Sequence, residues 1–234
     1  MTAETLAAPV RLDLWADIAC PWCFLGSARL DAVLAEAETR GEVVELRHRA
    51  FELNPGMPSE GVPMAGFLEA KFGGTAALDE AKERLRALGA EVGIDFDFEA
   101  VGKAPSTRLA HHLLSTYDGD LRQRTALRSL YSAYFERGLD VTDGDVVVGV
   151  VSEATGESRD DVRVRLTASL DGVDAEIELG RSLGISSVPT FIADAGAEID
   201  PAVGLSAAAV AMQGAQPTEA LEQLLSEARR RATA

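Results

Sequence analysis

The length, composition and charge of the chain limit the classes of protein to which it can belong. Its 234 residues, 47% of them apolar and 26% charged, are enough for one soluble domain with a substantial core, or for a domain that carries an insertion. A net charge of −16 repels phosphate backbones and anionic lipid surfaces, which argues against nucleic-acid and membrane partners. The sequence has neither an apolar run of about 18 residues nor a basic leader, so we expect no membrane span, no secretory signal and a cytoplasmic location.

The N-terminal part predicts a strand, a helix and a second strand. Residues 10–18 are apolar and β-favouring, residues 24–38 carry apolar side chains at helical spacing, and residues 43–51 alternate between apolar and polar positions. Gly41 ends the helix. A helix of this length between two strands favours parallel pairing with a right-handed crossover.

The middle of the chain changes to helical periodicity and the end returns to β. Apolar side chains recur at three- and four-residue steps between residues 63 and 184. Strands are predicted at 187–194 and at Val210–Gln213, and a last helix runs from Pro217 or Thr218 to about Arg231. Residues 195–209, rich in alanine and glycine, are predicted to form a loop.

This order predicts an α/β fold in which a sheet domain is interrupted. We expect a discontinuous domain made of residues 1–62 and 185–234, with an all-helical domain inserted at residues 63–184. A sheet built from both ends of the chain explains the layout better than two sequential domains.

The two cysteines of the chain, Cys20 and Cys23, are separated by Pro21 and Trp22 at the junction of the first strand and helix. The N-terminus of a helix offers unpaired N–H groups and partial positive charge, and both favour a thiolate, the reactive form of cysteine. We therefore expect Cys20 to be the attacking sulfur and the more exposed of the two, and Cys23 to resolve the mixed disulfide. Pro21 suits a first helical turn, and Trp22 offers an apolar cover. Two buried cysteines with only a packing role are the alternative.

Pro189 opens the predicted strand at 187–194. Proline adopts a cis peptide bond at modest cost, and such a bond would present the backbone of Val188 to an extended substrate. Taken alone, a proline at the start of a strand indicates only an edge position. Together with the cysteine pair it indicates a substrate-binding loop.

Several motifs resemble, in the same order, those of the DsbA-like thioredoxin superfamily, and above all its FrnE-like branch. The resemblance covers residues 10–230 and implies a thioredoxin-like fold, a mixed central sheet flanked by helices, with an inserted all-helical domain. It also implies thiol–disulfide oxidoreductase activity, with Cys20 and Cys23 as the redox pair and Val188–Pro189 as the cis-proline dipeptide. The motifs are DIACPWCFLG, FELNP, STRLAHHLL, LYSAYFERGLDVTD, GISSVPTF and GAQP.

Other polar residues carry weaker signals. Asp17 could accept a proton from the cysteine pair through water, and a role in capping the loop is favoured over it. Arg49 and Asn54 are expected in surface or turn roles. For His111 and His112 we expect one packed and one exposed ring, neither catalytic. Together with His48 they show no ligand spacing, so no metal site is expected.

The leading hypothesis is a thiol–disulfide oxidoreductase without metal, nucleotide or flavin, acting on protein thiols and disulfides or on glutathione. The first alternative is a glutathione-dependent isomerase or transferase, of the kappa-class or 2-hydroxychromene-2-carboxylate isomerase type. Those proteins have a similar layout but typically a serine at the first cysteine position. The second alternative is a redox-inert peptide-binding module. A homodimer is compatible with the sequence, which does not identify an interface.

Overall fold

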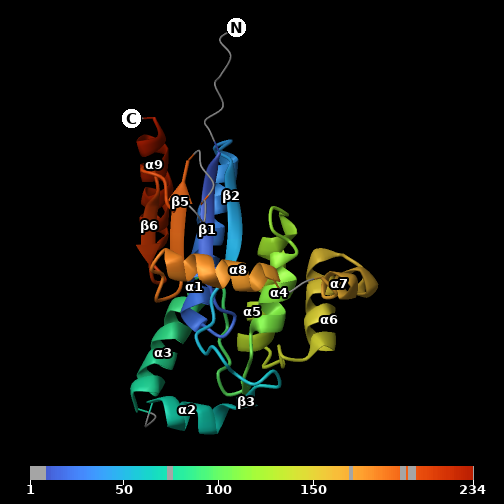
Figure 1. Cartoon of the computed structure of the whole chain (residues 1–234). Coiled ribbons are helices and arrows are strands. Elements are labelled where there is room, and N and C mark those ends of the chain that lie inside the picture. Colours follow the sequence, from blue (N-terminus) through green and yellow to red (C-terminus); the bar gives the residue numbers. More distant parts are fainter. Residues whose placement is uncertain (1–8, 73–75, 169–170, 196–198, 200–203, 234) are drawn as a thin grey trace.

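The chain forms a mixed sheet whose strands come from both ends of the sequence, with a helical insertion between them (Figure 1). The computed structural model describes residues 9–72, 76–168, 171–195, 199 and 204–233. The strands are β1 (Val10–Ala16), β2 (Val44–Ala50), β3 (Val62–Pro63), β4 (Lys103–Ala104), β5 (Thr190–Asp194) and β6 (Val210–Gln213). The helices are α1 (Pro21–Thr39), α2 (Met64–Phe72), α3 (Ala76–Ala90), α4 (Arg108–Ser115), α5 (Arg122–Phe135), α6 (Gly144–Thr155), α7 (Arg159–Arg165), α8 (Asp171–Ser182) and α9 (Thr218–Ala232).

The main sheet has the strand order β2-β1-β5-β6. β1 pairs with β2 in parallel, from Val10 opposite Val44 to Ala16 opposite Ala50, which confirms the predicted strand–helix–strand unit. β5 runs antiparallel to β1 and β6 antiparallel to β5, so the sheet is mixed as predicted. β6 spans Val210–Gln213, the bounds that the sequence predicted.

Both faces of β1 are covered, because successive side chains of a strand point to opposite faces. Leu12 and Leu14 belong to the large core that also contains residues of α1 and α9. Trp15 lies in a smaller cluster with Ile185, and its ring is so close to α8 that a Cβ at Gly180 would lie 2.7 Å from the indole nitrogen. The sheet is therefore packed between α1 and α9 on one face and α8 on the other.

The insertion between β2 and β5 holds seven of the described helices, α2 to α8. It is helical as predicted, apart from the two-residue antiparallel pair of β3 and β4. Figure 1 shows α2 and α3 below the sheet, whereas α4 to α7 lie beside it. Helix capping follows the sequence: Asp143 accepts hydrogen bonds from the first turn of α6, and the Ser158 hydroxyl accepts one from Asp161 N at 3.1 Å at the start of α7.

Two expectations cannot be compared fully with the structure. Part of the predicted loop at 195–209 lies outside the described residues, because 196–198 and 200–203 are not described. The first eight residues, to which the expectation about a secretory signal refers, also lie outside. In the described part of the chain, no helix combines the length and the apolar character that crossing a bilayer requires.

Candidate active site

The two cysteines lie at the N-terminus of α1, where the sheet meets the inserted helices. Cys20 is the N-cap residue, with φ −101° and ψ 109°, and Pro21 occupies the first helical position. The Sγ atom of Cys20 accepts a hydrogen bond from the backbone N–H of Cys23 at 3.3 Å. A side-chain acceptor at this position satisfies one of the donors that every helix start leaves unpaired. The same contact would stabilise a negative charge on Cys20.

Both cysteines are free thiols and both are buried. Cys20 exposes 4% of its surface and Cys23 exposes none. Cys20 is thus the more exposed of the two, as expected, but by a narrow margin. The position of Cys20 at the start of a helix predicts more exposure than this, because the residues that cover it come from a distant part of the chain.

The cover of Cys20 is the loop before β5. The peptide bond between Val188 and Pro189 is cis, as expected from the sequence. The Cys20 thiol lies 4.0 Å from the carbonyl oxygen of Val188, although the two residues are 168 positions apart. Within the described residues, the backbone N–H of Val188 has no hydrogen-bond partner.

The proline loop is held firmly against α1 and β6. A Cβ at Gly26 would lie 3.1 Å from Cγ of Pro189, so the absent side chain lets the proline ring rest on the helix. The carbonyl oxygen of Pro189 accepts a hydrogen bond from Gly214 N at 2.8 Å, and the Thr190 hydroxyl donates to Ser187 O at 2.7 Å. The loop is therefore positioned by both the helix of the cysteine motif and the edge strand.

Cys23 faces an apolar environment and resists ionisation. Burial raises the pKa of its thiol well above the usual value, and the hydrogen bond and charge of Cys20 raise it further. Phe24, the next residue, stacks on Tyr131 of α5, with ring centroids 5.2 Å apart and planes inclined by 15°. The Tyr131 hydroxyl is buried and has no hydrogen-bond partner among the described residues. Burial raises the pKa of Tyr131 well above its usual value, and the charges of Cys23, Cys20 and Asp17 contribute. Its place in the sequence does not reveal this neighbourhood, because the helical spacing of Tyr131 is that of a packing residue.

Asp17 is buried at the start of the loop between β1 and the cysteine motif, with 1% of its surface exposed. Its carboxylate accepts hydrogen bonds from Ala19 N at 3.1 Å and from Leu53 N at 2.7 Å, so it ties the cysteine loop to the chain after β2. This is the capping role that the sequence favoured. The charge of Asp17 also reaches Cys23 and is one of the smaller causes that raise the pKa of that thiol.

The histidines lie differently from the prediction. His111 and His112 are both buried, with 0% and 2% of their surfaces exposed, so the expectation of one exposed ring is wrong. α4 is enclosed on two sides, by β2 and by α8, and helical periodicity does not show a second buried face. His111 lies 3.5 Å from Asp17 and 3.2 Å from His48. In the sequence, the contact between the histidines is indicated only by His48. It is a polar residue at a position of β2 that the alternating pattern places on the buried face.

Arg49 and Asn54 stay outside the cysteine site. Arg49 is a partly buried ion-pair centre, bonded to Asp13 at 2.6 Å and to Glu176 at 3.4 Å, so its expected surface role is wrong. Asn54 accepts a hydrogen bond from Lys71 at 2.5 Å on the surface, consistent with the expected turn role. Within the described residues, no group of three or more histidine, cysteine or acidic side chains is arranged to hold a metal ion.

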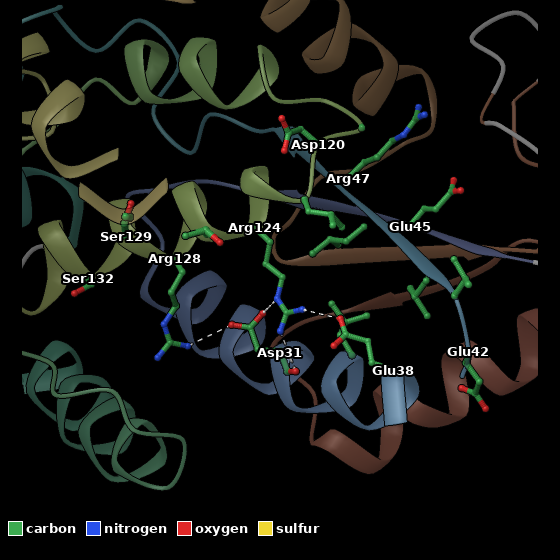
Figure 2. A pocket seen from close by; sticks show the side chains of 18 of the residues that line it. Asp31, Glu38, Glu42, Glu45, Arg47, Asp120, Arg124, Arg128, Ser129 and Ser132 are labelled. Atoms are coloured by element: carbon green, nitrogen blue, oxygen red, sulfur yellow. Dashed lines mark hydrogen bonds and ion pairs between the residues drawn. The ribbon is translucent and has the colours of Figure 1, made fainter. Parts of the chain in front are cut away.

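A large surface cavity of about 1010 Å³ lies away from the cysteines, between α1, the start of β2 and α5. Figure 2 shows that its central cations are already engaged: Arg124 reaches Asp31 and Glu38, and Arg128 reaches Asp31. Neither cysteine lines this cavity. This cavity is therefore separate from the cysteine site.

Comparison with known proteins agrees with this geometry. The model of the DSBA-like thioredoxin domain matches residues 11–226. The chain belongs to this family. A solved structure described as a probable DsbA oxidoreductase from Streptomyces coelicolor is 30% identical, with a TM-score of 0.77, and the match covers 94% of this chain and 89% of that one. The DsbA-like family is one of thiol oxidoreductases, and the mixed sheet and the helical insertion fit it.

Two more distant structures share the fold of this DsbA-like chain. The cytosolic disulfide reductase DsbM from Pseudomonas aeruginosa, solved with GSH, is 15% identical with a TM-score of 0.58, covering 95% of this chain and 97% of that one. A 2-hydroxychromene-2-carboxylate isomerase is 19% identical with a TM-score of 0.64, covering 95% of this chain and 98% of that one. At these identities the likeness concerns the fold alone.

Proposed function

We propose that this DsbA-like chain is a thiol–disulfide oxidoreductase that uses the Cys20–Cys23 pair. The observation that carries the proposal is the placement of Cys20. Its sulfur caps α1 at 3.3 Å from Cys23 N and lies 4.0 Å from the carbonyl of Val188, in the loop of the cis proline. A sulfur so placed can form a thiolate and meet an extended substrate at the same point.

In the reducing direction, the Cys20 thiolate attacks a substrate disulfide. A bond forms between Cys20 and one substrate sulfur, while the other substrate sulfur leaves as a thiolate with the electron pair. Cys23 then loses its proton and attacks the sulfur of Cys20, which forms the internal disulfide and releases the second substrate thiolate. The substrate gains two electrons and the cysteine pair loses two. The oxidising direction is the reverse.

The second step requires a proton acceptor, because the pKa of Cys23 is raised well above its usual value by burial and by Cys20. Asp17 is the buried carboxylate nearest in sequence to the motif, and its charge reaches this thiol. We assign it the proton of Cys23 in addition to its role in the loop.

Substrates of the proposed enzyme are protein thiols and disulfides or glutathione, held through the free N–H of Val188 and over Pro189. Pro21 sets the first turn of α1, and Trp22 forms an apolar edge beside the sulfurs. We place the enzyme in the cytoplasm, because the similar reductase from P. aeruginosa is described as cytosolic and was solved with GSH. Neither a metal nor an organic cofactor enters the steps above.

The test is dithiothreitol-driven reduction of insulin, with oxidative refolding of a reduced protein as the complementary assay. We expect Cys20→Ser to abolish both activities, and Cys23→Ala to trap a covalent complex with the substrate. Undiminished activity of the Cys20→Ser variant contradicts the proposal. Equilibration with a glutathione buffer series then gives the reduction potential, which decides the direction.

A second candidate function is glutathione-dependent isomerisation, since the isomerase structure matches this chain over 95% of its length. A single activated thiol would suffice for that reaction, so it does not require Cys23. Isomerisation of a glutathione conjugate that survives in a Cys23→Ser variant would favour this candidate. Its absence, together with disulfide exchange by the wild type, favours the oxidoreductase.

A further inference from the structure

The outer edge of β2 forms one border of the main sheet, because the strand order is β2-β1-β5-β6 (Figure 1). β2 bonds to β1 through its odd-numbered residues: Val43 O accepts from Val10 N, and Phe51 N donates to Ala16 O. Successive residues of a strand direct their N–H and C=O groups to opposite sides. The even-numbered residues of β2 therefore direct theirs away from the sheet.

The second half of this edge is closed by side chains from two helices. His48 N donates a hydrogen bond to Oε1 of Gln123 in α5 at 2.7 Å. Ala50 N donates one to Oε2 of Glu176 in α8 at 3.0 Å. Both bonds confirm that the even-numbered residues face outward, and both protect backbone groups that an edge strand otherwise leaves unpaired.

The first half of the edge is open and faces the large surface cavity. Within the described residues, the outward N–H and C=O groups of Val44 and Leu46 have no hydrogen-bond partner. Every residue from 43 to 47 lines the cavity of about 1010 Å³, although the side chains of these residues alternate between the two faces of the sheet. The cavity therefore opens onto the strand edge itself. We call this hollow, between residues 43–47, α1 and α5, the edge cleft.

Two large apolar side chains stand exposed at the edge cleft. Val43, just before β2, exposes 56% of its surface, and Leu121, at the start of α5, exposes 93%. Both line the cavity. Burying apolar surface of this kind against a partner is favourable, so the cleft offers apolar contacts beside its unpaired backbone groups.

The charge of the edge cleft favours a basic occupant. Among the described residues that line it, six carry carboxylates and three carry guanidinium groups. Figure 2 shows Arg124 turned toward Asp31, so this cation is already engaged. Glu38 lies 3.9 Å from Arg124, and Glu45 lies 3.7 Å from Arg11. Exposed ion pairs at such distances contribute little, which leaves both glutamates able to pair with cations of a partner.

The occupant that fits these features is an extended segment of another polypeptide. Such a segment supplies N–H and C=O groups at the spacing of a strand, as the open half of β2 requires. The carboxylates of the cleft repel nucleic acids and anionic lipids. A second copy of this chain would bring two molecules of net charge −16 edge to edge, which is unfavourable.

We propose that the edge cleft binds an extended, basic segment of a protein substrate, which adds a short strand to β2 alongside Val44 and Leu46. The backbone of the segment supplies partners for the outward N–H and C=O groups, and its apolar side chains cover Val43 and Leu121. Its lysine or arginine side chains pair with the carboxylates of the cleft. The identity of the partner as a substrate rests on the proposed function, whereas the binding itself requires neither cysteine.

The edge cleft and the cysteines lie at different positions along α1. Leu34, which lines the cleft, follows Cys20 by 14 positions, and the rise of an α-helix places it about 20 Å further along the axis. A substrate bound in the cleft is therefore held by a part of its chain remote from the reacting disulfide. Such a second contact raises the affinity for long substrates without changing the chemical step.

Binding is measured by fluorescence anisotropy with labelled peptides of about six residues, the length of an ordinary strand. One peptide alternates lysine with valine, one alternates glutamate with valine, and one alternates lysine with proline, which lacks the backbone donor. We expect the lysine–valine peptide to bind at least about tenfold more tightly than either of the others, and to lose affinity as salt is added. Equal binding of the three peptides, or no binding, overturns the inference.

Val44→Pro tests whether the peptide pairs with the strand edge. Proline removes one outward N–H and leaves the bonds between β1 and β2 in place, because those are made by the odd-numbered residues. Val44→Ala is the matched control, since it loses the same apolar side chain but keeps the N–H. We expect Val44→Pro to weaken binding of the lysine–valine peptide about tenfold, and Val44→Ala less than about threefold. Equal affinities of the two variants overturn the inference.

Hydrogen exchange of the unmodified chain covers the case in which Val44→Pro does not fold. Saturation with the lysine–valine peptide should slow exchange of the Val44 and Leu46 amides at least about tenfold. The amide of His48, which already donates to Gln123, should change less than about twofold. Absent or uniform protection overturns the inference. So does a dimer in sedimentation experiments that protects Val44 and Leu46 without peptide.

A disulfide-bonded peptide joined to the lysine–valine segment by a flexible glycine–serine linker tests the connection with catalysis. For the wild type we expect a KM about fivefold lower than for the same peptide without the segment, with kcat unchanged. For Val44→Pro the two KM values should agree. A segment that has no effect on the wild type overturns the inference. If neither peptide is reduced while the anisotropy assay still shows binding, it is the proposed function that fails.

Discussion

Adding a single methyl group at Gly26 tests whether the contact between α1 and the proline loop sets the position of the active site. A Cβ there would lie 3.1 Å from Cγ of Pro189, 3.3 Å from Cζ of Phe191 and 3.5 Å from Cα of Ala215. Overpacking of this kind costs about 1–3 kcal/mol. Replacing glycine inside a helix returns roughly 0.5–1 kcal/mol. We therefore expect Gly26→Ala to lower the free energy of unfolding by about 1 kcal/mol, or about 2–4 °C in Tm.

The matched control is Gly66→Ala in α2, where an added Cβ would meet nothing within 4 Å. This variant gains the same helix propensity without the contact, so it should be neutral or slightly stabilising. Gly26→Ala should also slow the attack of Cys20 on dithiobis(nitrobenzoate) about twofold to tenfold, because the added methyl group pushes the loop that carries Val188 away from Cys20. This attack releases one thionitrobenzoate, whose absorbance gives the rate. Denaturant titration and stopped-flow absorbance measure the two effects. If the two alanine variants behave alike in both assays, the loop is not positioned by this contact.

Two further predictions concern charges. Burial raises the pKa of Asp13 more than Arg49 lowers it, and burial likewise raises that of Glu176, so Arg49→Met should cost about 3–5 kcal/mol at neutral pH by leaving both carboxylates without their cation. A carboxyl whose pKa is raised in the folded state destabilises that state as the pH rises. The loss of unfolding free energy in Arg49→Met should therefore be smaller when denaturant titrations are made at mildly acidic pH. A loss that does not change with pH would contradict the role of Arg49 as the cation of these two carboxylates. Arg84 lies over the ring of Trp22, with its guanidinium carbon 5.5 Å from the centroid, and no ion pair within the described structure engages it. If Arg84 contacts a carboxylate of glutathione disulfide, Arg84→Ala should lower kcat/KM for that substrate about twofold to fivefold. The value for hydroxyethyl disulfide, which is uncharged, should not change. Equal losses for the two substrates would exclude the contact between Arg84 and the glutathione carboxylate.

Much of the site could be predicted because its chemistry is local. Two cysteines at this spacing, at the end of an apolar strand and the start of a helix, define a sulfur at a helix N-terminus without any tertiary information. The proline of the proposed substrate loop was found in the same way, by its place at the start of a strand. The bounds of β6 also follow from side-chain chemistry within a few residues.

The remaining features depend on residues far apart in the sequence. The near-complete burial of Cys20 comes from the loop 168 positions away, and no local pattern records that approach. His48 and His111 are 63 positions apart, and each alone resembles a packed ring. Periodicity shows which face of an element is apolar, but it does not show which other element covers that face.

The sequence by itself thus determined that a dithiol stands at the start of α1 in a DsbA-like fold. It could do so because helix capping and residue spacing act over only a few bonds. Tertiary packing decided which distant groups lie near that end of the sheet: the carbonyl of Val188 at Cys20, and His111 and His48 behind the buried Asp17. Those neighbours are set by how α4, β2 and the proline loop pack together, and packing is a property of the whole core.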